Sequence, residues 1–382
     1  MARNINICHN TMDVVLEGTL VPHETSPLAT SPIAIPGELD TRSKYPEGGP
    51  RTQRLPRLQV PIDAGSSERA WSAYFPASGI RGHLRRIARS IFHVHYGQDM
   101  DIDELRYLTI GGIKGSASEP SFNLANAQAL RERLPLISLF GATSDLGHGW
   151  VSGKLCVHHA IPTSPLTPQI INGVRSDDLC RDPMETHFLS EEAAKTLTQR
   201  ANAERRASAL RRIKKEASRE LAAAKRSKDQ DARKAAEARI IDIEAQLETL
   251  SNSIGTDVSV QMPLDGYEVI SPGTTLNHMF RLQGATPAEL GLFLMTLEEW
   301  AYTQGLGAHT NHGCGVIHGN WDVRVREELG STFEPAGRIN LKPFDHTAFE
   351  GRIQELYVDC RDAFLDSIQS IKDRPLREVL QA

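Results

Sequence analysis

One short stretch of the chain combines a hydroxyl group with several arginines, side chains that commonly bind phosphate. In the segment 76–97 (PASGIRGHLRRIARSIFHVHYG) apolar residues recur at helical spacing, and Ser78 is a candidate cap at the start of this helix. The other positions hold no acidic residue and four basic ones, namely Arg81, Arg85, Arg86 and Arg89. Because free N–H groups at a helix entrance and guanidinium groups both suit an anion, we predict a phosphate site there.

A glycine-rich segment at 305–315 (GLGAHTNHGCG) is a second candidate for binding a phosphate backbone. Glycines leave backbone N–H groups unobstructed, so such a loop can follow a sugar-phosphate chain closely. A tight connection from a helix to a strand explains the same glycines equally well. The candidate binding residues in this loop are Gly307, His309, Thr310, Asn311, His312 and Gly313.

A basic residue in a smaller glycine cluster joins these candidates. Lys114 lies in GGIKG at 111–115, which has the wrong order of residues for a nucleotide-triphosphate loop, and no strand clearly precedes it. We therefore exclude a triphosphatase. As a basic residue among glycines, Lys114 is instead expected to contact nucleic acid.

The segment from Pro22 to Pro61 contains too many prolines and glycines for a regular element. Its second half is basic, with only Glu47 as an acidic residue between positions 42 and 57. The basic residues are Arg42, Lys44, Arg51, Arg54 and Arg57. A solvated surface excursion and a nucleic-acid contact explain this pattern about equally well.

Familiar catalytic and metal-binding patterns are missing from the sequence. The residues around Ser78 read ASGIRG, which is not the GxSxG of a nucleophile elbow. Cys156 with His158 and His159, and His309 and His312 with Cys314, lack a second pair at zinc-ligand spacing. We expect no metal, no cofactor and no catalytic centre. Asp40 and Asp63 flank the basic loop and support a minority hypothesis, cleavage of a bound strand by orienting a 2′-hydroxyl.

The elements expected to position these residues form an α+β pattern. Residues 11–21 and 274–283 alternate as strands. Thr286 and Glu289 form a capping box for a helix that runs to about Gln304, and alternation resumes at 316–326. Strand, helix, glycine-rich loop and strand in this order favour a two-layer domain of ferredoxin-like or RRM-like type.

The stretch 189–250 differs in composition, being rich in alanine, arginine, lysine and glutamate and free of glycine and proline. Apolar residues recur at spacings of three and four, and RSKDQD at 226–231 is the expected turn. We predict an inserted antiparallel helical hairpin. Its basic residues outnumber acidic ones between 205 and 234, which suits either a solvated face or a polyanionic or acidic neighbour.

Bulk composition limits where the protein acts and how it binds. The 382 residues carry a net charge of −5, so nucleic-acid binding must come from local basic patches. No apolar run is long enough for a membrane span, and the N-terminal residues lack a secretory pattern. Five cysteines without a pairing pattern fit a reducing interior. We expect a cytoplasmic protein without membrane contact.

Three segments together resemble motifs of the CRISPR-associated RAMP superfamily. FPASGIRGHLRR at 75–86 resembles its motif at a helix start, and LFGA at 139–142 followed by GKLCVHHA at 153–160 resembles its second element. LGAHTNHGCGVI at 306–317 resembles its C-terminal glycine loop, with His312 where arginine is usual. The resemblance points to the backbone subunits of Cas-seven type, and the basic helical insertion favours the type IV version.

The resemblance implies a modified ferredoxin-like palm with a thumb-like extension. The expected domains are 1–188, which includes the thumb-like extension 22–68, then the hairpin 189–252, and 253–382 with the glycine loop and a C-terminal helix. It also implies that Ser78, Arg81 and Arg85 bind guide phosphates and that Gly307 to Gly315 support the same strand.

The implied function is a non-catalytic subunit that oligomerises along a prokaryotic guide RNA. Expected partners are the guide crRNA, further copies of the chain in a filament, other effector subunits, the target DNA or RNA, and a helicase. Two alternatives are an endoribonuclease of type III kind, using Asp40 or Asp63, and a guide-processing endoribonuclease. The latter would need His309, His312 or His23 as acid and base.

Overall fold

The chain divides into two compact units, which are described separately. The computed structural model describes residues 11–30, 54–63, 65–111, 124–142, 151–174, 190–227, 229–254, 263–328 and 330–381. The first unit combines Met1–Asn172 with Asp265–Ala382, and the second is Gly173–Leu264. Five residues of the sequence predictions lie outside the described ranges, namely Asp40, Arg42, Lys44, Arg51 and Lys114.

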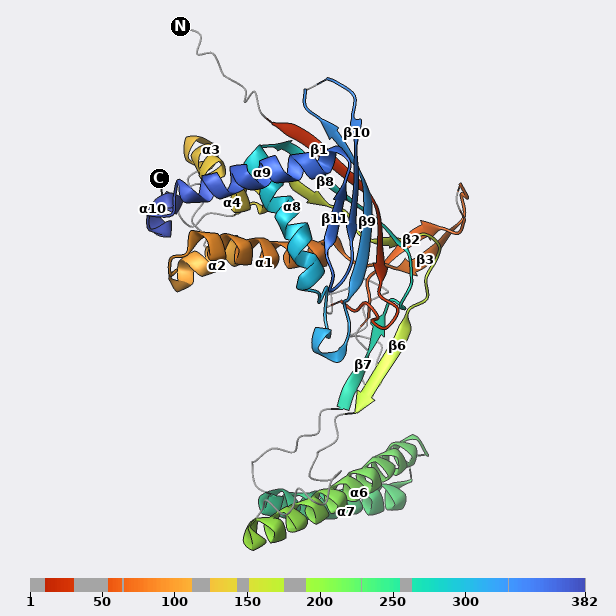
Figure 1. Cartoon of the computed structure of the whole chain (residues 1–382). Coiled ribbons are helices and arrows are strands. Elements are labelled where there is room, and N and C mark those ends of the chain that lie inside the picture. Colours follow the sequence, from red (N-terminus) through yellow and green to blue (C-terminus); the bar gives the residue numbers. More distant parts are fainter. Residues whose placement is uncertain are drawn as a thin grey trace. The chain divides into compact units, whose positions relative to one another are not determined.

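An antiparallel sheet forms the centre of the first unit (Figure 1). Its strands follow the order β11-β10-β9-β1-β8-β4, and β5 also pairs with β8. The bounds are β1 Met12–Pro22, β4 Leu155–Val157, β5 Ile161–Pro162, β8 Leu276–Ala285, β9 Ile317–Arg326, β10 Glu334–Leu341 and β11 Thr347–Glu350. The strands predicted near 11–21, 274–283 and 316–326 are thus confirmed as β1, β8 and β9.

The central strand β1 joins the two halves of the chain. Leu16 of β1 lies opposite Phe280 of β8 on one side and Val323 of β9 on the other. Along β9, buried and exposed residues alternate over the whole strand. This period of two places one face of the sheet in the core.

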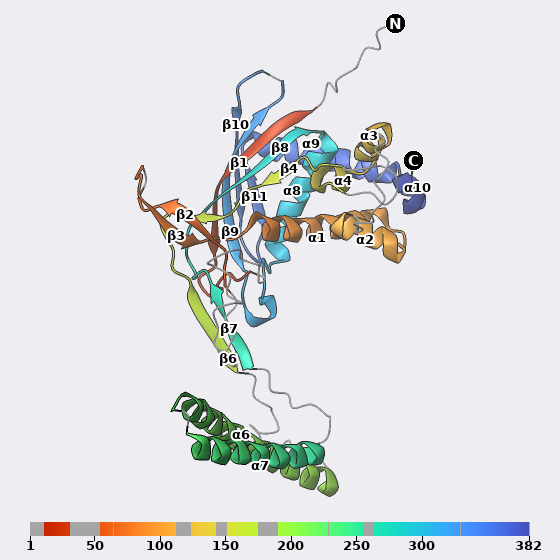
Figure 2. The ribbon, with the colours of Figure 1, turned by 180° about the vertical axis from the view of Figure 1, so that it is seen from behind.

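Helices cover that buried face (Figures 1 and 2). The three long ones are α1 Ala77–Tyr96, α8 Pro287–Tyr302 and α9 Arg352–Gln369. Shorter helices are α2 Ile102–Ile110, α3 Leu124–Arg133, α4 Pro135–Phe140 and α10 Leu376–Gln381. The core between helices and sheet contains Phe280, Phe293, Trp300, Trp321 and Phe364, all fully buried. The first unit is therefore α+β, as predicted.

The start of α8 matches the predicted capping box. The Thr286 hydroxyl accepts a hydrogen bond from the Glu289 N–H, and the Glu289 carboxylate accepts one from the Thr286 N–H, at 3.3 Å and 2.8 Å. Pro287 occupies the first helical position. Lys154 forms an ion pair with the buried Glu289 at 2.8 Å, which attaches the chain before β4 to this helix.

Two short ribbons extend the first unit. β2 (Arg57–Pro61) pairs antiparallel with β3 (Arg69–Ala73), and β6 (Gln169–Val174) pairs with β7 (Pro263–Val269). The boundaries with the second unit fall within or next to β6 and β7.

The second unit contains the long helices α6 (Glu191–Ser227) and α7 (Gln230–Ile254), with their connection inside the predicted turn. Small side chains such as Ala217, Ala224 and Ala236 are buried in it. Ion pairs from Lys214 to Glu244 and from Arg239 to Glu220 join the helices at 2.6 Å and 3.2 Å. Among the described helices, none has the length and apolarity required to cross a bilayer.

Candidate nucleic-acid interface

The chain enters α1 differently from the sequence prediction. The N-cap residue of α1 is Pro76 and not Ser78, and the side chain of the N-cap residue forms no capping hydrogen bond. The Ala77 N–H instead donates to Nδ1 of His159, at 2.9 Å. Burial, and the neighbouring His158, lower the pKa of His159, which favours the neutral ring that can accept this bond. Ser78 follows in the first turn with its side chain exposed.

A cavity of about 760 Å³, the entrance cavity, opens beside this end of α1. Ser78, Arg81 and Arg85 line one side of it. The other side comes from the end of α4 with Gly141 and Ala142, and from residues 151–153 and 155–157. Two of the three segments that carry the family resemblance therefore meet in one cavity.

Arg81 joins these two segments directly. Its Nη2 donates to the Phe140 carbonyl at 2.7 Å, while its buried Nε has no partner among the described residues. Gly153 makes room for the guanidinium, since a Cβ at this position would lie 2.9 Å from Nη2 of Arg81 and 2.5 Å from the Leu139 carbonyl. A donor buried without a partner is unusual. The Arg81 residue itself lines the cavity, where a guanidinium suits an anion.

Arg85 is held by the last turn of α2. Its Nε donates to the Leu108 carbonyl at 2.9 Å and its Nη2 to the Tyr107 carbonyl at 3.4 Å. Carbonyls at a helix C-terminus carry partial negative charge and stabilise a cation. Burial, with the nearby charge of Arg81, lowers the pKa of Arg85 to about 10, so it stays protonated at neutral pH.

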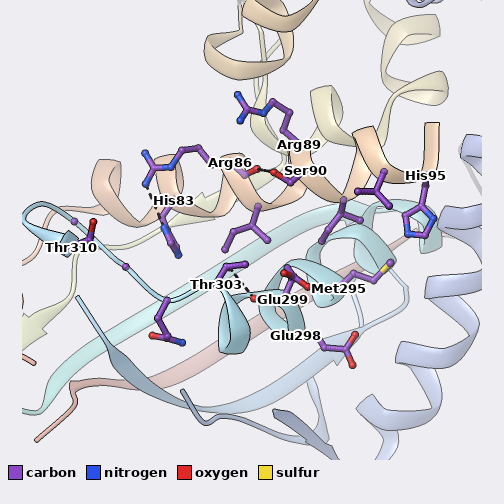
Figure 3. A pocket seen from close by; sticks show the side chains of 16 residues that line it. His83, Arg86, Arg89, Ser90, His95, Met295, Glu298, Glu299, Thr303 and Thr310 are labelled. Carbon is purple, nitrogen blue, oxygen red and sulfur yellow. Dashed lines mark hydrogen bonds between the residues drawn. The ribbon is translucent and has the colours of Figure 1, made fainter. Parts of the chain in front are cut away.

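A second cavity, the interhelical cavity of about 730 Å³, lies between α1 and α8 and reaches the glycine loop (Figure 3). From α1 it is lined by His83, Arg86, Arg89 and Ser90, and from α8 by Glu298 and Glu299. Gly305, Gly307 and Thr310 belong to its loop side. The third segment of the resemblance thus also borders α1.

His83 is the buried histidine of this cavity. Its ring lies 5.3 Å from that of Trp300, and Nη2 of Arg86 is 3.5 Å from its Nδ1. Burial and the charge of Arg86 lower the pKa of His83 to about 4. The imidazole is therefore neutral at physiological pH, and the positive charge at this position comes from Arg86.

The glycine loop is attached to the residues that follow β1. The Ala308 N–H donates to the Ala29 carbonyl at 3.0 Å, and the Gly315 N–H donates to the Pro27 carbonyl at 2.9 Å. A Cβ on Gly307 would lie 2.0 Å from the Ala29 carbonyl, and its φ is +89°. Gly307 is thus required by packing within the chain, whereas Thr310, Asn311, His312 and Gly313 are exposed.

One histidine of this loop stacks on a tyrosine, and a second histidine stacks on the first. The His309 ring lies 3.8 Å from that of Tyr267 at an angle of 11°, and the His312 ring stacks 5.8 Å from His309. Burial and the proximity of His312 lower the pKa of His309. His23, the third histidine of the processing hypothesis, stacks instead on His318 at 5.3 Å.

Arg57 of the basic segment is tied to the protein itself. Its guanidinium pairs with Glu268 at 2.7 Å, with side-chain exposures of 16% and 8%, and the Leu55 N–H donates to the same carboxylate. The ion pair gives Arg57 a structural role, and its contact with nucleic acid stays a prediction. Arg54 is exposed, and Asp63 is exposed in the turn between β2 and β3.

Sequence reasoning assigned no binding role to Gly153, which lines the entrance cavity, or to His159, which accepts the Ala77 N–H at the start of α1. Both lie in GKLCVHHA, a segment that carried the resemblance, but their partners Arg81 and Ala77 are distant in the sequence. In the part of the chain that the structure describes, no group of three or more His, Cys, Asp or Glu side chains is placed to hold a metal ion.

Comparison with known proteins gives structural neighbours only. No family model and no curated protein matches the chain. A chain of a structure titled "Type IV-B CRISPR Complex" is similar at 15% identity and a TM-score of 0.38, covering 84% of this chain and 94% of that one. Csc2 of Thermofilum pendens is similar at 11% identity and a TM-score of 0.37, covering 97% and 92%. Both TM-scores are low, so function is inferred below from this chain's own residues.

Proposed function

We propose that this chain is a backbone subunit of a CRISPR effector complex, which binds the guide RNA and assembles along it. One observation carries the proposal: three segments far apart in the sequence line two cavities that flank the single helix α1. This helix contains several arginines and no acidic residue. A surface of this kind suits the phosphates of a strand, whose bases then remain available for pairing.

The topology supports a ferredoxin-like palm for this subunit. The units β1-α1-β4 and β8-α8-β9 each connect two strands through a helix, and the four strands lie in the order β9-β1-β8-β4. That order, with all neighbours antiparallel, is the arrangement that two interleaved strand-helix-strand units produce. We assign the thumb to the segment 22–68, in which the β2 strand lies.

Arg81 is the strongest candidate for a phosphate contact. Arg81 lines the entrance cavity together with the exposed Ser78, and its buried Nε lacks a partner among the described residues. A phosphate there would accept charge-assisted hydrogen bonds. Such contacts read no base, so we expect binding with little sequence preference and a strong dependence on salt.

The proposal includes assembly and partners. Further copies of the chain would occupy successive segments of the guide in the prokaryotic cytoplasm, without a catalytic centre in this subunit. Other effector subunits, the target DNA or RNA and a helicase would join this type IV assembly. The stacked arrangement of His309 and His312 favours this scaffold over a processing enzyme, because the rings contact each other rather than facing across a substrate.

Binding to single-stranded RNAs of increasing length tests the proposal. We expect similar affinity for unrelated sequences, weaker binding to duplex DNA, and more protein molecules bound as the RNA lengthens, measured by fluorescence anisotropy and mass photometry. The logarithm of the affinity should fall linearly with the logarithm of salt concentration, by about 0.7 for each phosphate contacted. A protein that binds none of these RNAs, or one copy regardless of length, would contradict the proposal.

A further inference from the structure

Gly82 is a glycine that the protein itself does not need. It lies in the interior of α1, where glycine destabilises a helix relative to alanine. Its φ is not in the left-handed region, and a Cβ built on it would meet no atom within 4 Å. Alanine would therefore fit this position without steric conflict and would stabilise the helix.

For every other glycine whose surroundings the structure describes, packing or backbone conformation within the protein explains why glycine is present. Some approach another atom closely, such as Gly79, where a Cβ would lie 3.0 Å from Phe75, and Gly291, where it would lie 1.9 Å from the Cys360 carbonyl. Others face open space but have a positive φ, such as Gly65 and Gly313. Among the described glycines, Gly82 alone has neither reason.

The position of Gly82 suggests what requires it. Ser78 and Arg86 lie one turn before and one turn after it on the same face of α1. Arg81 and Arg85 line the entrance cavity on one side, whereas His83 and Arg86 line the interhelical cavity on the other. Helical spacing places Gly82 on the ridge between the two cavities.

We propose that the sugar-phosphate backbone of a single RNA strand crosses α1 directly over Gly82, passing from the entrance cavity to the interhelical cavity. The missing side chain lets the strand approach the helix backbone, and Arg81 and Arg86 bind the phosphates on either side. This inference rests on the proposed function and adds the path of the strand. α1 has no acidic residue along that path, and the carboxylates that line the interhelical cavity, Glu298 and Glu299, lie on α8 across from it.

Substitution of Gly82 distinguishes an RNA contact from a structural role of this glycine. With an RNA contact the unfolding midpoint rises while RNA binding weakens, whereas with a structural role the unfolding midpoint falls. In full-length protein, Gly82→Ala should raise the unfolding midpoint by about 2 °C. The same change should weaken binding of a fluorescein-labelled single-stranded RNA by about tenfold, and Gly82→Leu should weaken it further. Gln354→Leu adds the larger side chain at an exposed position of α9 that lines neither cavity, and should leave the affinity unchanged.

Three results would overturn the inference. If the wild-type protein binds RNA and Gly82→Ala and Gly82→Leu bind it equally well, no strand crosses at Gly82, while the proposed function stands. If both variants lose affinity together with a lower unfolding midpoint, the fold itself needs this glycine. If the wild-type protein binds no RNA, the proposed function fails and the inference with it.

Discussion

The guanidinium of Arg81 and the backbone carbonyl of Phe140 are joined by a hydrogen bond of 2.7 Å, which links the start of α1 to the end of α4. This bond orients Arg81 while its Nε remains without a partner among the described residues. Arg81 is thus held in place through its Nη2, and it lines the entrance cavity, in which we propose that a phosphate binds. Such preorganisation lowers the entropic cost of binding a phosphate.

Arg81→Ala should therefore reduce the affinity for single-stranded RNA. The loss of a charge-assisted contact of about 2 kcal/mol predicts a dissociation constant raised about thirtyfold, and a shallower dependence of affinity on salt. Fluorescence anisotropy at several salt concentrations measures both. Arg377→Ala, at an exposed arginine of α10, is the matched control. Equal losses in the two variants would show that only overall charge matters.

Glu268→Ala should destabilise the first unit strongly. The carboxylate accepts hydrogen bonds from Arg57 and from the Leu55 N–H, and it is 8% exposed. Its removal leaves a largely buried guanidinium without its counter-ion, which costs about 3 kcal/mol of unfolding free energy. Urea denaturation measures the change.

The control is a pair exposed to solvent. Glu17→Ala removes the partner of Arg324, where the side chains are 64% and 46% exposed, and should change the unfolding free energy by less than about 0.5 kcal/mol. Similar losses for Glu268→Ala and Glu17→Ala would show that burial of the Arg57 pair has no energetic consequence.

The buried His83 should make the fold sensitive to acid. Its pKa is lowered from the ordinary 6.5 to about 4, so the folded state resists protonation that the unfolded chain accepts. The associated stability is fully present above pH ~6.5 and is lost as the pH falls toward 4, by about 3 kcal/mol in all. His83→Leu should reduce this pH dependence, as measured by urea denaturation between pH 4 and 8. A pH profile identical to that of the wild type would refute the assignment.

Removal of the helical hairpin should leave the first unit folded. The core of that unit is built from its own residues, and the small buried side chains of α6 and α7 belong to a separate compact unit. Replacing residues 190–254 by a short glycine-serine linker should therefore shift the unfolding midpoint of the first unit by no more than about 2 °C. Calorimetry of the two proteins measures this, and an insoluble or unfolded variant would contradict the division into units.

Sequence patterns predicted the fold well where neighbouring residues decide the structure. The capping box of Thr286 and Glu289 lies within one turn, and the alternation of β9 lies within one strand. Local propensity and burial agree in both elements, so the sequence suffices to place them.

The site was predicted less accurately where a contact with a residue distant in the sequence determines the structure. Ser78 has a side chain suited to capping, yet the ring of His159 accepts the free N–H of Ala77 instead. Gly307 was expected to expose its backbone to a ligand, whereas the Ala29 carbonyl packs against it. Neither partner is near in sequence, so no local pattern could have revealed these contacts.

The most direct test of the account is the composition of the full-length protein purified from cells with and without a CRISPR array. Light scattering and the ratio of absorbance at two ultraviolet wavelengths report the mass and the RNA content. We predict multimers that contain guide RNA when the array is present, and RNA-free protein or nonspecific complexes without it. A monomer free of RNA under both conditions would contradict the central claim.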